Sequence, residues 1–283
     1  LFFRFVIGVF GLMPFPLLYL LSDFVCLILY KIVGYRKKVV FNNLKNSFPD
    51  KSPTEIKRIA DLFYKHLADL LVESFKGFSM SEKTFNKRYI FKNPEVINKN
   101  PEAGGNSIIM APHYGNWEWG VLSLPMYIKI HIVGFYKPLK NKYIDDFTRT
   151  RYKYTNIELL SIAQTNNGFE KNKDKSTAYF LVSDQSIPSD KGHWVTFLNQ
   201  DTICPYGGDK YAHTYNYPVF YLEINRVRRG FYELIFEKLA SNPANLPEQE
   251  ITKLFMARLE KQIKAKPQEW LWSHKRWKHK RTQ

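Results

Sequence analysis

A histidine and a glutamate five positions apart, within the stretch 107–118, are residue types that could carry out general base catalysis. The apolar run 108–111 predicts a buried strand, so His113 is expected at the carboxyl end of that strand, just before a helix. Open α/β sheets bind their ligands at this edge. If Glu118 lies in the first turns of the helix, its carboxylate can orient one imidazole nitrogen while the other takes a proton. A structural histidine is the alternative, because the spacing alone is a weak signal.

The elements expected around this stretch alternate between strands and helices. Strands are predicted at 108–111, 131–136, 157–162, 178–183, 218–224 and 231–236, and helices at 116–127, 142–154, 208–215 and 247–265. A further helix is predicted to begin at the capping box Ser52-Pro53-Thr54-Glu55 and to run to about Lys76. This order is typical of an α/β fold in which helices flank a mixed, mainly parallel sheet. We expect residues 39–283 to form this domain.

Residues 1–38 are strongly apolar and are predicted to associate with a membrane. Residues 5–21 carry no charge, residues 24–33 contain a single lysine, and a basic cluster follows at 36–38. The run 5–21 contains Pro14 and is shorter than the roughly 20 residues that an uninterrupted transmembrane helix needs. A kinked anchor, a pair of segments dipping into one leaflet, a signal peptide and a buried helical hairpin are the alternatives. No small-residue cleavage site supports a signal peptide, and the basic cluster favours the cytoplasmic side.

The charge of the chain favours anionic partners. The 283 residues carry a formal net charge of +16, which suits nucleic acid, acidic lipid, phosphorylated substrates or an acidic carrier protein, although a solvated basic surface is also possible. The segment 270–281 mixes tryptophan with basic residues and suits a bilayer interface better than nucleic acid, because no RNA-binding signature accompanies it. Cys26 and Cys204 have no neighbours at ligand spacing, so neither a metal site nor a disulfide framework is expected.

Five motifs in order along residues 107–278 resemble the secondary (late) acyltransferases of bacterial lipid A biosynthesis, within the glycerolipid acyltransferase superfamily. The motifs are His113-Tyr114-Gly115-Asn116-Trp117-Glu118, Tyr136-Lys137-Pro138, Asp146-Phe147-Thr148-Arg149-Thr150-Arg151, Ser183-Asp184-Gln185 and the segment 267–278. The chain departs from the family in the stretch 195–199, where relatives often carry a glycine-containing sequence. This departure bears on the specificity for the acceptor or the acyl chain more than on the reaction.

The resemblance implies roles for individual residues. His113 would be the general base and Glu118 the group that orients it and balances its charge. Arg151, with Arg149 as the alternative, would bind a phosphate or a developing oxyanion, and Asp184 would position that arginine or the substrate. Further substrate contacts would come from Asn116, Trp117, Lys137, Arg149 and Gln185. The resemblance implies neither a metal nor an organic cofactor.

The function implied by the resemblance is that of a membrane-associated O-acyltransferase of lipid A and lipopolysaccharide biosynthesis, at the cytoplasmic face of the bacterial inner membrane. The donor would be an acyl thioester on acyl carrier protein or on coenzyme A, and the acceptor a hydroxyl of a lipid A precursor, an anionic glycolipid. Nucleic acid is not an expected partner. A phospholipid, a mannosylated lipid or an amino-acid lipid as acceptor, and a catalytically silent lipid-binding protein, are the alternatives. The sequence Ser183-Asp184-Gln185-Ser186 stands where glycerol-phosphate acyltransferases usually carry E-G-T-R.

Overall fold

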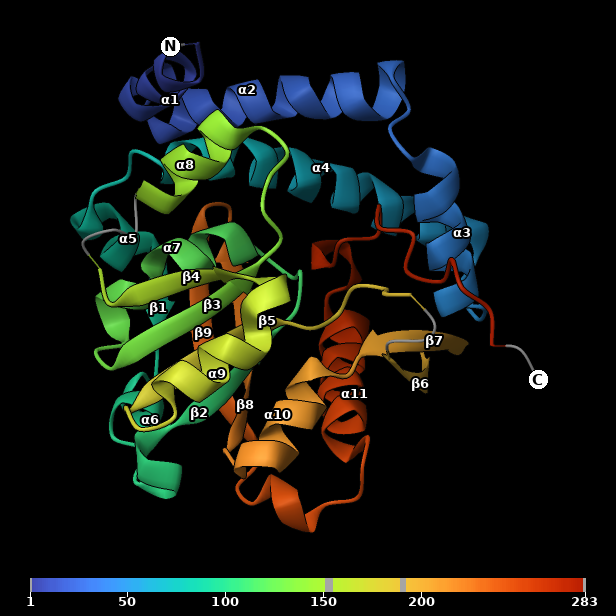
Figure 1. Cartoon of the computed structure of the whole chain (residues 1–283). Helices are drawn as coiled ribbons and strands as arrows, with labels where there is room; N and C mark the ends of the chain where they lie inside the picture. The colour runs from blue at the N-terminus through green and yellow to red at the C-terminus, as the bar shows by residue number, and fades with distance from the viewer. Residues whose placement is uncertain (1, 151–154, 189–191, 282–283) are drawn as a thin grey trace.

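A mixed sheet with helices on both faces forms the centre of the protein. The computed structural model describes residues 2–150, 155–188 and 192–281 (Figure 1). Seven of the described strands form one sheet in the order β1-β9-β8-β2-β5-β3-β4, and two form a separate hairpin. The strands are β1 Tyr89–Phe91, β2 Ser107–Ala111, β3 His131–Tyr136, β4 Ile157–Ser161, β5 Thr177–Val182, β8 Val219–Arg228 and β9 Phe231–Ala240, with the hairpin β6 Gly192–Phe197 and β7 Gln200–Pro205. Only the β8–β9 pair within the large sheet is antiparallel, so the predicted mixed, mainly parallel sheet is confirmed.

The helices agree with the predicted pattern where the sequence signals are strong. They are α1 Phe2–Leu12, α2 Phe15–Leu27 with a π-helical turn Ile28–Ile32, α3 Lys37–Ser47, α4 Pro53–Gly77, α5 Glu82–Arg88, α6 Glu95–Asn98, α7 Trp117–Tyr127, α8 Lys142–Thr150, α9 Thr165–Asn172, α10 Gly207–Tyr215 and α11 Glu250–Ala265, with 3₁₀ turns at Glu102–Gly105, Ile162–Gln164, Pro243–Asn245 and Pro267–Glu269. The capping box at the start of α4 is present: the Ser52 hydroxyl accepts the Glu55 N–H, and the Glu55 carboxylate accepts the Ser52 N–H at 2.9 Å. Residues 151–154, the end of the predicted 142–154 helix, lie outside the described residues.

The central strand β2 shows why this sheet is buried on both faces. All five of its residues are buried. Ile108 and Met110 pack in a core with α3, α4, α9, α10 and α11, whereas Ile109 and Ala111 pack in a second core with α5 and α7. A continuous apolar run is the pattern expected of a parallel strand covered by helices on both sides.

The apolar N-terminal segment folds as two helices, and the second one lies along α4 (Figure 1). Pro14 separates α1 from α2, because proline fits the start of a helix better than its interior. The stretch Phe15–Ile32 is apolar and long enough to cross a membrane by length and composition, and 17% of it is buried in the protein. Helix α3 begins at Lys37, next to the predicted boundary between residues 38 and 39. That boundary stays a prediction.

Residues 195–199, where the chain departs from the family pattern, lie at the end of strand β6 and in the turn of the β6–β7 hairpin. Leu198 and Asn199 both have positive φ, 49° and 63°, and form the two-residue turn between the strands. Two-residue hairpin turns of this kind usually contain glycine, so the turn carried no clear sequence signal. The sequence analysis did not predict this hairpin, nor helices α3, α5, α6 and α9.

Candidate active site

Two neighbouring parallel strands bring His113 and Asp184 together. Ala111, the last residue of β2, lies opposite Val182, the last residue of β5. The pairing continues for one more hydrogen bond, from the Ser183 N–H to the Ala111 carbonyl at 3.0 Å. His113 and Asp184 each follow their strand by two residues, at the carboxyl edge where ligands of α/β sheets bind.

Asp184 holds the imidazole and the backbone of His113. Its Oδ1 lies 2.6 Å from His113 Nδ1, and its Oδ2 accepts the backbone N–H of His113 at 2.9 Å. Oδ2 also accepts the indole N–H of Trp270 at 2.9 Å. Burial alone would raise the pKa of this carboxyl, but the nearby His113 and these hydrogen bonds lower the pKa below its usual value. The carboxyl is therefore ionised and acceptor-only next to the histidine.

The second imidazole nitrogen faces Gln185. His113 Nε2 lies 3.0 Å from the side-chain nitrogen of Gln185, and the ring of Trp117 stands edge-on at 5.1 Å between centroids. A neutral imidazole with its proton on Nδ1 satisfies both contacts, because Nδ1–H donates to Asp184 and the Nε2 lone pair accepts from the amide. This tautomer leaves Nε2 as the proton acceptor. The side chain of His113 is 18% exposed, so the nitrogen is accessible from the surface.

The structure differs from the sequence analysis in the group that orients His113. Within the described residues no hydrogen bond joins Glu118 to His113, and Asp184 occupies Nδ1 instead. Glu118 is in the first turn of α7, which begins only at Trp117, and its carboxyl lies in a cleft beside α4. Glu118 remains exposed to solvent; desolvation by the surrounding protein atoms raises the pKa of its carboxyl, and the nearby His113 and a hydrogen bond with Trp117 lower the pKa in part. Glu118 is thus an electrostatic neighbour of the histidine and not its hydrogen-bond partner.

The cleft that contains Glu118 is mainly apolar and has a volume of about 250 Å³. It is lined by Tyr35, Arg36, Leu67, Leu70, Leu71, Ser74, Trp117, Glu118, Leu271, Ser273 and His274. The ring of Trp117, which lines the cleft, also lies 5.1 Å from the imidazole of His113 between centroids, so the cleft is near the histidine. Burial lowers the pKa of His274 to about 4, which keeps this second histidine neutral.

The loop that carries His113 is fixed by α4 and by the C-terminal segment. Gly115 has φ +59°, and a Cβ there would lie 2.7 Å from the side chain of Ile224, so only glycine fits. Its N–H donates to the Glu269 carbonyl at 2.9 Å, and its carbonyl lies 3.2 Å from Nε2 of His66. The His113 carbonyl accepts the Leu271 N–H at 3.2 Å. These bonds fix the backbone of Gly115 and the carbonyl of His113 in place.

Asn116 is fully buried and caps α7. Its side-chain oxygen accepts the Trp119 N–H at 2.9 Å, and its side-chain nitrogen donates to Glu73 at 2.7 Å. Tyr89 donates its hydroxyl to the Asn116 carbonyl at 2.7 Å. The amide is buried in these contacts and positions the loop in this structure.

The structure spreads the remaining predicted residues over the surface. Lys137 is exposed just after β3, and Arg149 is exposed on α8. Arg151 lies outside the described residues. Helix α8 packs against the N-terminal region through Phe147, whose ring centroid lies 5.4 Å from that of Phe3. Neither Lys137 nor Arg149 contacts His113 within the described part of the chain.

The sequence analysis missed four residues that support the site. They are His66 and Glu73 on α4 and Glu269 and Trp270 in the C-terminal segment. Trp270 is part of a motif that resembles the family, but its bond to Asp184 spans 86 positions. The two α4 residues are part of the predicted amphipathic helix and gave no separate signal. No group of three or more His, Cys, Asp or Glu side chains among the described residues could hold a metal ion.

Glu269 makes stability depend on pH. This residue is 4% exposed. Burial raises the pKa of its carboxyl from 4.5 to about 7, although Lys266 and Arg226 lower it in part. Because the folded pKa exceeds the unfolded one, the stability is fully present below pH 4.5 and is lost as the pH rises through about 7.

The variant Glu269→Gln is expected to be more stable than the parent protein at pH 8, by about 3 kcal/mol. The glutamine amide stays neutral at every pH, so no charge is buried at pH 8, and it keeps the shape of the glutamate side chain. Free energies of unfolding from denaturant titrations at pH 5 and pH 8 check this expectation. The parent should lose stability between these pH values, relative to the variant, and parallel curves would contradict the assignment.

The comparisons with known proteins identify a family for the chain. No curated protein sequence matches the chain at a significant level. The family model described as bacterial lipid A biosynthesis acyltransferase matches residues 2–279, nearly the whole chain. This protein therefore belongs to the family of bacterial lipid A biosynthesis acyltransferases.

Proposed function

We propose that the protein transfers a fatty acyl group from the thioester of acyl carrier protein to a hydroxyl of a lipid A precursor. The family supports acyl transfer in lipid A biosynthesis in general. The observation that carries the finer proposal is the His113–Asp184 pair at the carboxyl edge of the sheet, with Nδ1 2.6 Å from Asp184 and Nε2 beside the amide of Gln185. An aligned base next to an apolar cleft suits a hydroxyl on a lipid chain.

The reaction follows from this geometry. Nε2 of His113 takes the proton of the acceptor hydroxyl while the oxygen attacks the thioester carbonyl carbon. The tetrahedral intermediate then expels the sulfur, the C–S bond breaks, and the imidazolium returns its proton to the thiolate. Asp184 stabilises the imidazolium through Nδ1. A thioester already carries a good leaving group, so a base and a stabilised oxyanion suffice.

The other residues of the site have supporting roles in this proposal. Gln185 donates to Nε2 in the resting state and yields that position to the acceptor hydroxyl. Glu118 lies in the cleft and balances the positive charge of the protonated His113. The side chain of Trp117 lies between these two residues. Arg151, Arg149 and Lys137 provide cations for the phosphate groups or the oxyanion.

The cleft along α4 suits a fatty acyl chain. Leucines at 67, 70, 71 and 271 line it, together with Trp117 and Glu118. Burial of an alkyl chain contributes about 0.8 kcal/mol per methylene group. The chain would therefore bind with its carbonyl, or its hydroxyl, next to His113.

The N-terminal helices place the enzyme on the membrane surface in our proposal. Large apolar side chains on the outer face are exposed, among them Phe5, Leu12, Leu17, Leu20, Phe24, Leu27, Ile32 and Val33. Helix α2 is tied to the domain by polar contacts along its inner face, from Ser22 to Asp69 at 2.6 Å and from Asp23 to Arg229 at 2.7 Å. A helix that packs along the domain over its length lies parallel to the membrane, in the interface between lipid and water. The basic cluster 36–38 favours the cytoplasmic face of the inner membrane.

A donor-by-acceptor assay tests the proposed function. Detergent-solubilised protein is incubated with acyl carrier protein thioesters or acyl-CoA, and with a lipid A precursor or a phospholipid. Mass spectrometry should detect an acyl mass added to the lipid A precursor by the parent protein, and none in reactions with His113→Ala. Acylation of the phospholipid alone would overturn the acceptor. Transfer to no acceptor would overturn the catalytic role of His113 and leave a lipid-binding protein.

A further inference from the structure

A second cleft, separate from the apolar one, lies between α3, β7 and the C-terminal segment. Figure 1 shows this segment running beside α3 and the hairpin. The cleft has a volume of about 610 Å³ and is lined by Val39, Asn42, Asn43, Asn46, Gln200, Asp201, Lys275, Trp277, Lys278, His279, Lys280 and Arg281. Its composition combines cations, amides and an indole ring.

The cations of this cleft have no acidic partners. Lys275, Lys278, Lys280 and Arg281 are all exposed, and within the described residues none of them forms an ion pair. Asp201 is the one carboxylate among the lining residues. Four unpaired cations around one carboxylate attract a ligand with more than one negative charge.

The neutral lining residues suit a sugar. Asn42 and Asn46 are exposed on α3, and their amides can donate to and accept from hydroxyl groups. The indole N–H of Trp277 and Nε2 of His279 are buried and have no hydrogen-bond partner among the described residues, so the exposed amides are the groups that favour a sugar. The half-buried indole of Trp277 adds an apolar surface for a sugar ring.

The cleft is connected to the reacting centre through the C-terminal segment. Asn43 donates to the carbonyls of Trp272 and His274 at 2.9 and 3.0 Å, which fixes the segment against α3. Three residues separate Lys275 from Leu271, whose N–H binds the His113 carbonyl. Since an extended chain spans at most about 3.5 Å per residue, the Cα of Lys275 lies within roughly 14 Å of the Cα of Leu271.

The cleft also lies at the level of the membrane surface in our proposal. Helix α3 follows directly after the π-helical turn, whose neighbours Ile32 and Val33 are 73% and 63% exposed. A lipid with its chains beside α2 and α4 would therefore present its headgroup to α3. The apolar cleft and the basic cleft are then two parts of one lipid site, joined by residues 271–275.

We propose that the cleft between α3 and the C-terminal segment binds the phosphorylated saccharide headgroup of the lipid acceptor. This inference rests on the proposed function, because the acceptor whose hydroxyl reaches His113 is the lipid whose headgroup is bound here. The cations bind the phosphates, and the amides and Trp277 bind the sugar. The site thus selects an anionic glycolipid over an uncharged one.

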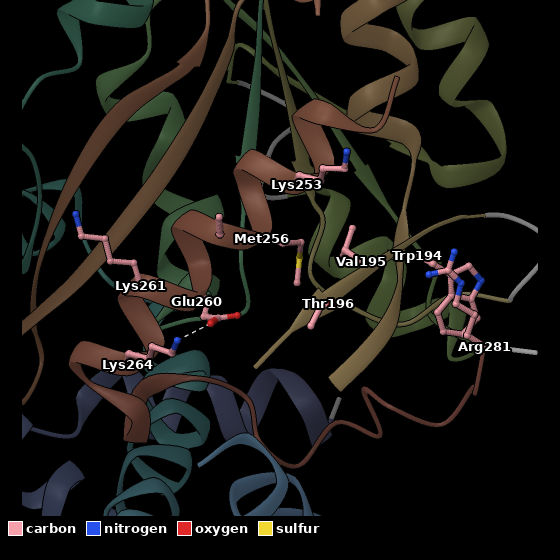
Figure 2. Close-up of a pocket in the computed structure, with 10 residues that line it drawn as sticks. Trp194, Val195, Thr196, Lys253, Met256, Glu260, Lys261, Lys264 and Arg281 are labelled. Atoms are coloured by element: carbon pink, nitrogen blue, oxygen red, sulfur yellow. Dashed lines mark ion pairs between the residues drawn. The ribbon is translucent and has the colours of Figure 1, made fainter. Parts of the chain in front are cut away.

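A cleft of similar size on the other side of the hairpin is a suitable control. Figure 2 shows this cleft, of about 690 Å³, between α11 and β6. Its lysines are largely neutralised or turned away: Lys264 pairs with Glu260 at 2.6 Å, Lys253 lies 3.6 Å from Glu250, and Lys261 points away from β6. The control variant Lys253→Gln/Lys261→Gln removes the same charge as Lys275→Gln/Lys278→Gln without touching the proposed headgroup site.

Equilibrium binding to detergent-solubilised protein tests the inference without turnover. The probes are a phosphorylated lipid A precursor, the same lipid without phosphates, and micelles containing phosphatidylglycerol. The Lys275→Gln/Lys278→Gln variant should bind the phosphorylated precursor at least tenfold more weakly and the dephosphorylated lipid as the parent does. The control variant should bind all probes as the parent does. In the acylation assay KM for the phosphorylated acceptor should rise while kcat stays within about twofold.

Each other outcome overturns the inference. An unchanged affinity of the Lys275→Gln/Lys278→Gln variant for the phosphorylated precursor excludes the cleft as its site. An equal loss for phosphatidylglycerol micelles makes the segment a general anchor for anionic lipid. A failure of the proposed function is seen separately, as absent turnover in the parent protein with binding intact.

Discussion

Replacement of His113 by alanine should lower kcat for acyl transfer at least a thousandfold, and Asp184→Asn should lower it by about 10³- to 10⁴-fold. Without His113 no group is aligned to take the hydroxyl proton. The asparagine keeps the size of Asp184 but loses the charge that stabilises the imidazolium. It also presents an amide N–H that can favour the wrong tautomer of the histidine.

A second histidine–carboxylate pair provides the matched control. His131 and Glu158 lie 3.4 Å apart near the opposite end of their strands, where no ligand edge is expected. The variant Glu158→Gln should keep kcat within about twofold. Steady-state kinetics give kcat for all three variants. Circular dichroism verifies that each variant is folded. A folded Asp184→Asn enzyme with parental kcat would exclude Asp184 as the orienting group.

The variant Asp69→Asn should destabilise the protein by about 3–5 kcal/mol. Asp69 is 2% exposed and accepts hydrogen bonds from Arg226, Arg229 and Ser22. The asparagine leaves the buried Arg226 without its carboxylate, and the desolvation of an unpaired guanidinium is the main cost. The effect should extend to the site, because Arg226 also contacts His66, which holds Gly115.

An exposed ion pair on the same helix serves as the comparison. Lys57 and Asp61 on α4 lie 2.8 Å apart, with 61% and 36% of their side chains exposed. The variant Lys57→Gln should cost less than about 1 kcal/mol, since water replaces the lost partner. Denaturant titrations with both variants in the same detergent measure the difference. Similar losses of stability would show that the buried network contributes no more than a surface pair.

The buried network also ties helix α2 to the loop that carries His113. Glu73 accepts hydrogen bonds from Tyr19 on α2 at 2.8 Å, Asn116 at 2.7 Å and Tyr232 at 2.8 Å. Burial raises the pKa of Glu73. The loop that carries His113 and the apolar helix α2 therefore contact the same buried carboxyl.

Much of the fold was predictable because its signals are local. The capping box of α4, the apolar run of β2 and the alternation of strands with helices depend on neighbours within a few positions. The position of His113 after a strand follows from the same pattern. The β6–β7 hairpin was not predictable, because its turn at Leu198 and Asn199 lacks the usual glycine.

The sequence by itself determined the α/β architecture, the apolar N-terminus and the position of His113 at the edge of the sheet. Only the tertiary structure decided which carboxylate contacts that histidine. Asp184 is 71 positions from His113, and parallel pairing of β2 with β5 brings them within 2.6 Å. Glu118 is closer in sequence, but the start of α7 at Trp117 turns it toward α4. The spacing of residues along the chain predicts contacts within one helix or strand. Strand register and packing determine contacts between elements, and the contact of His113 with Asp184 is of this second kind.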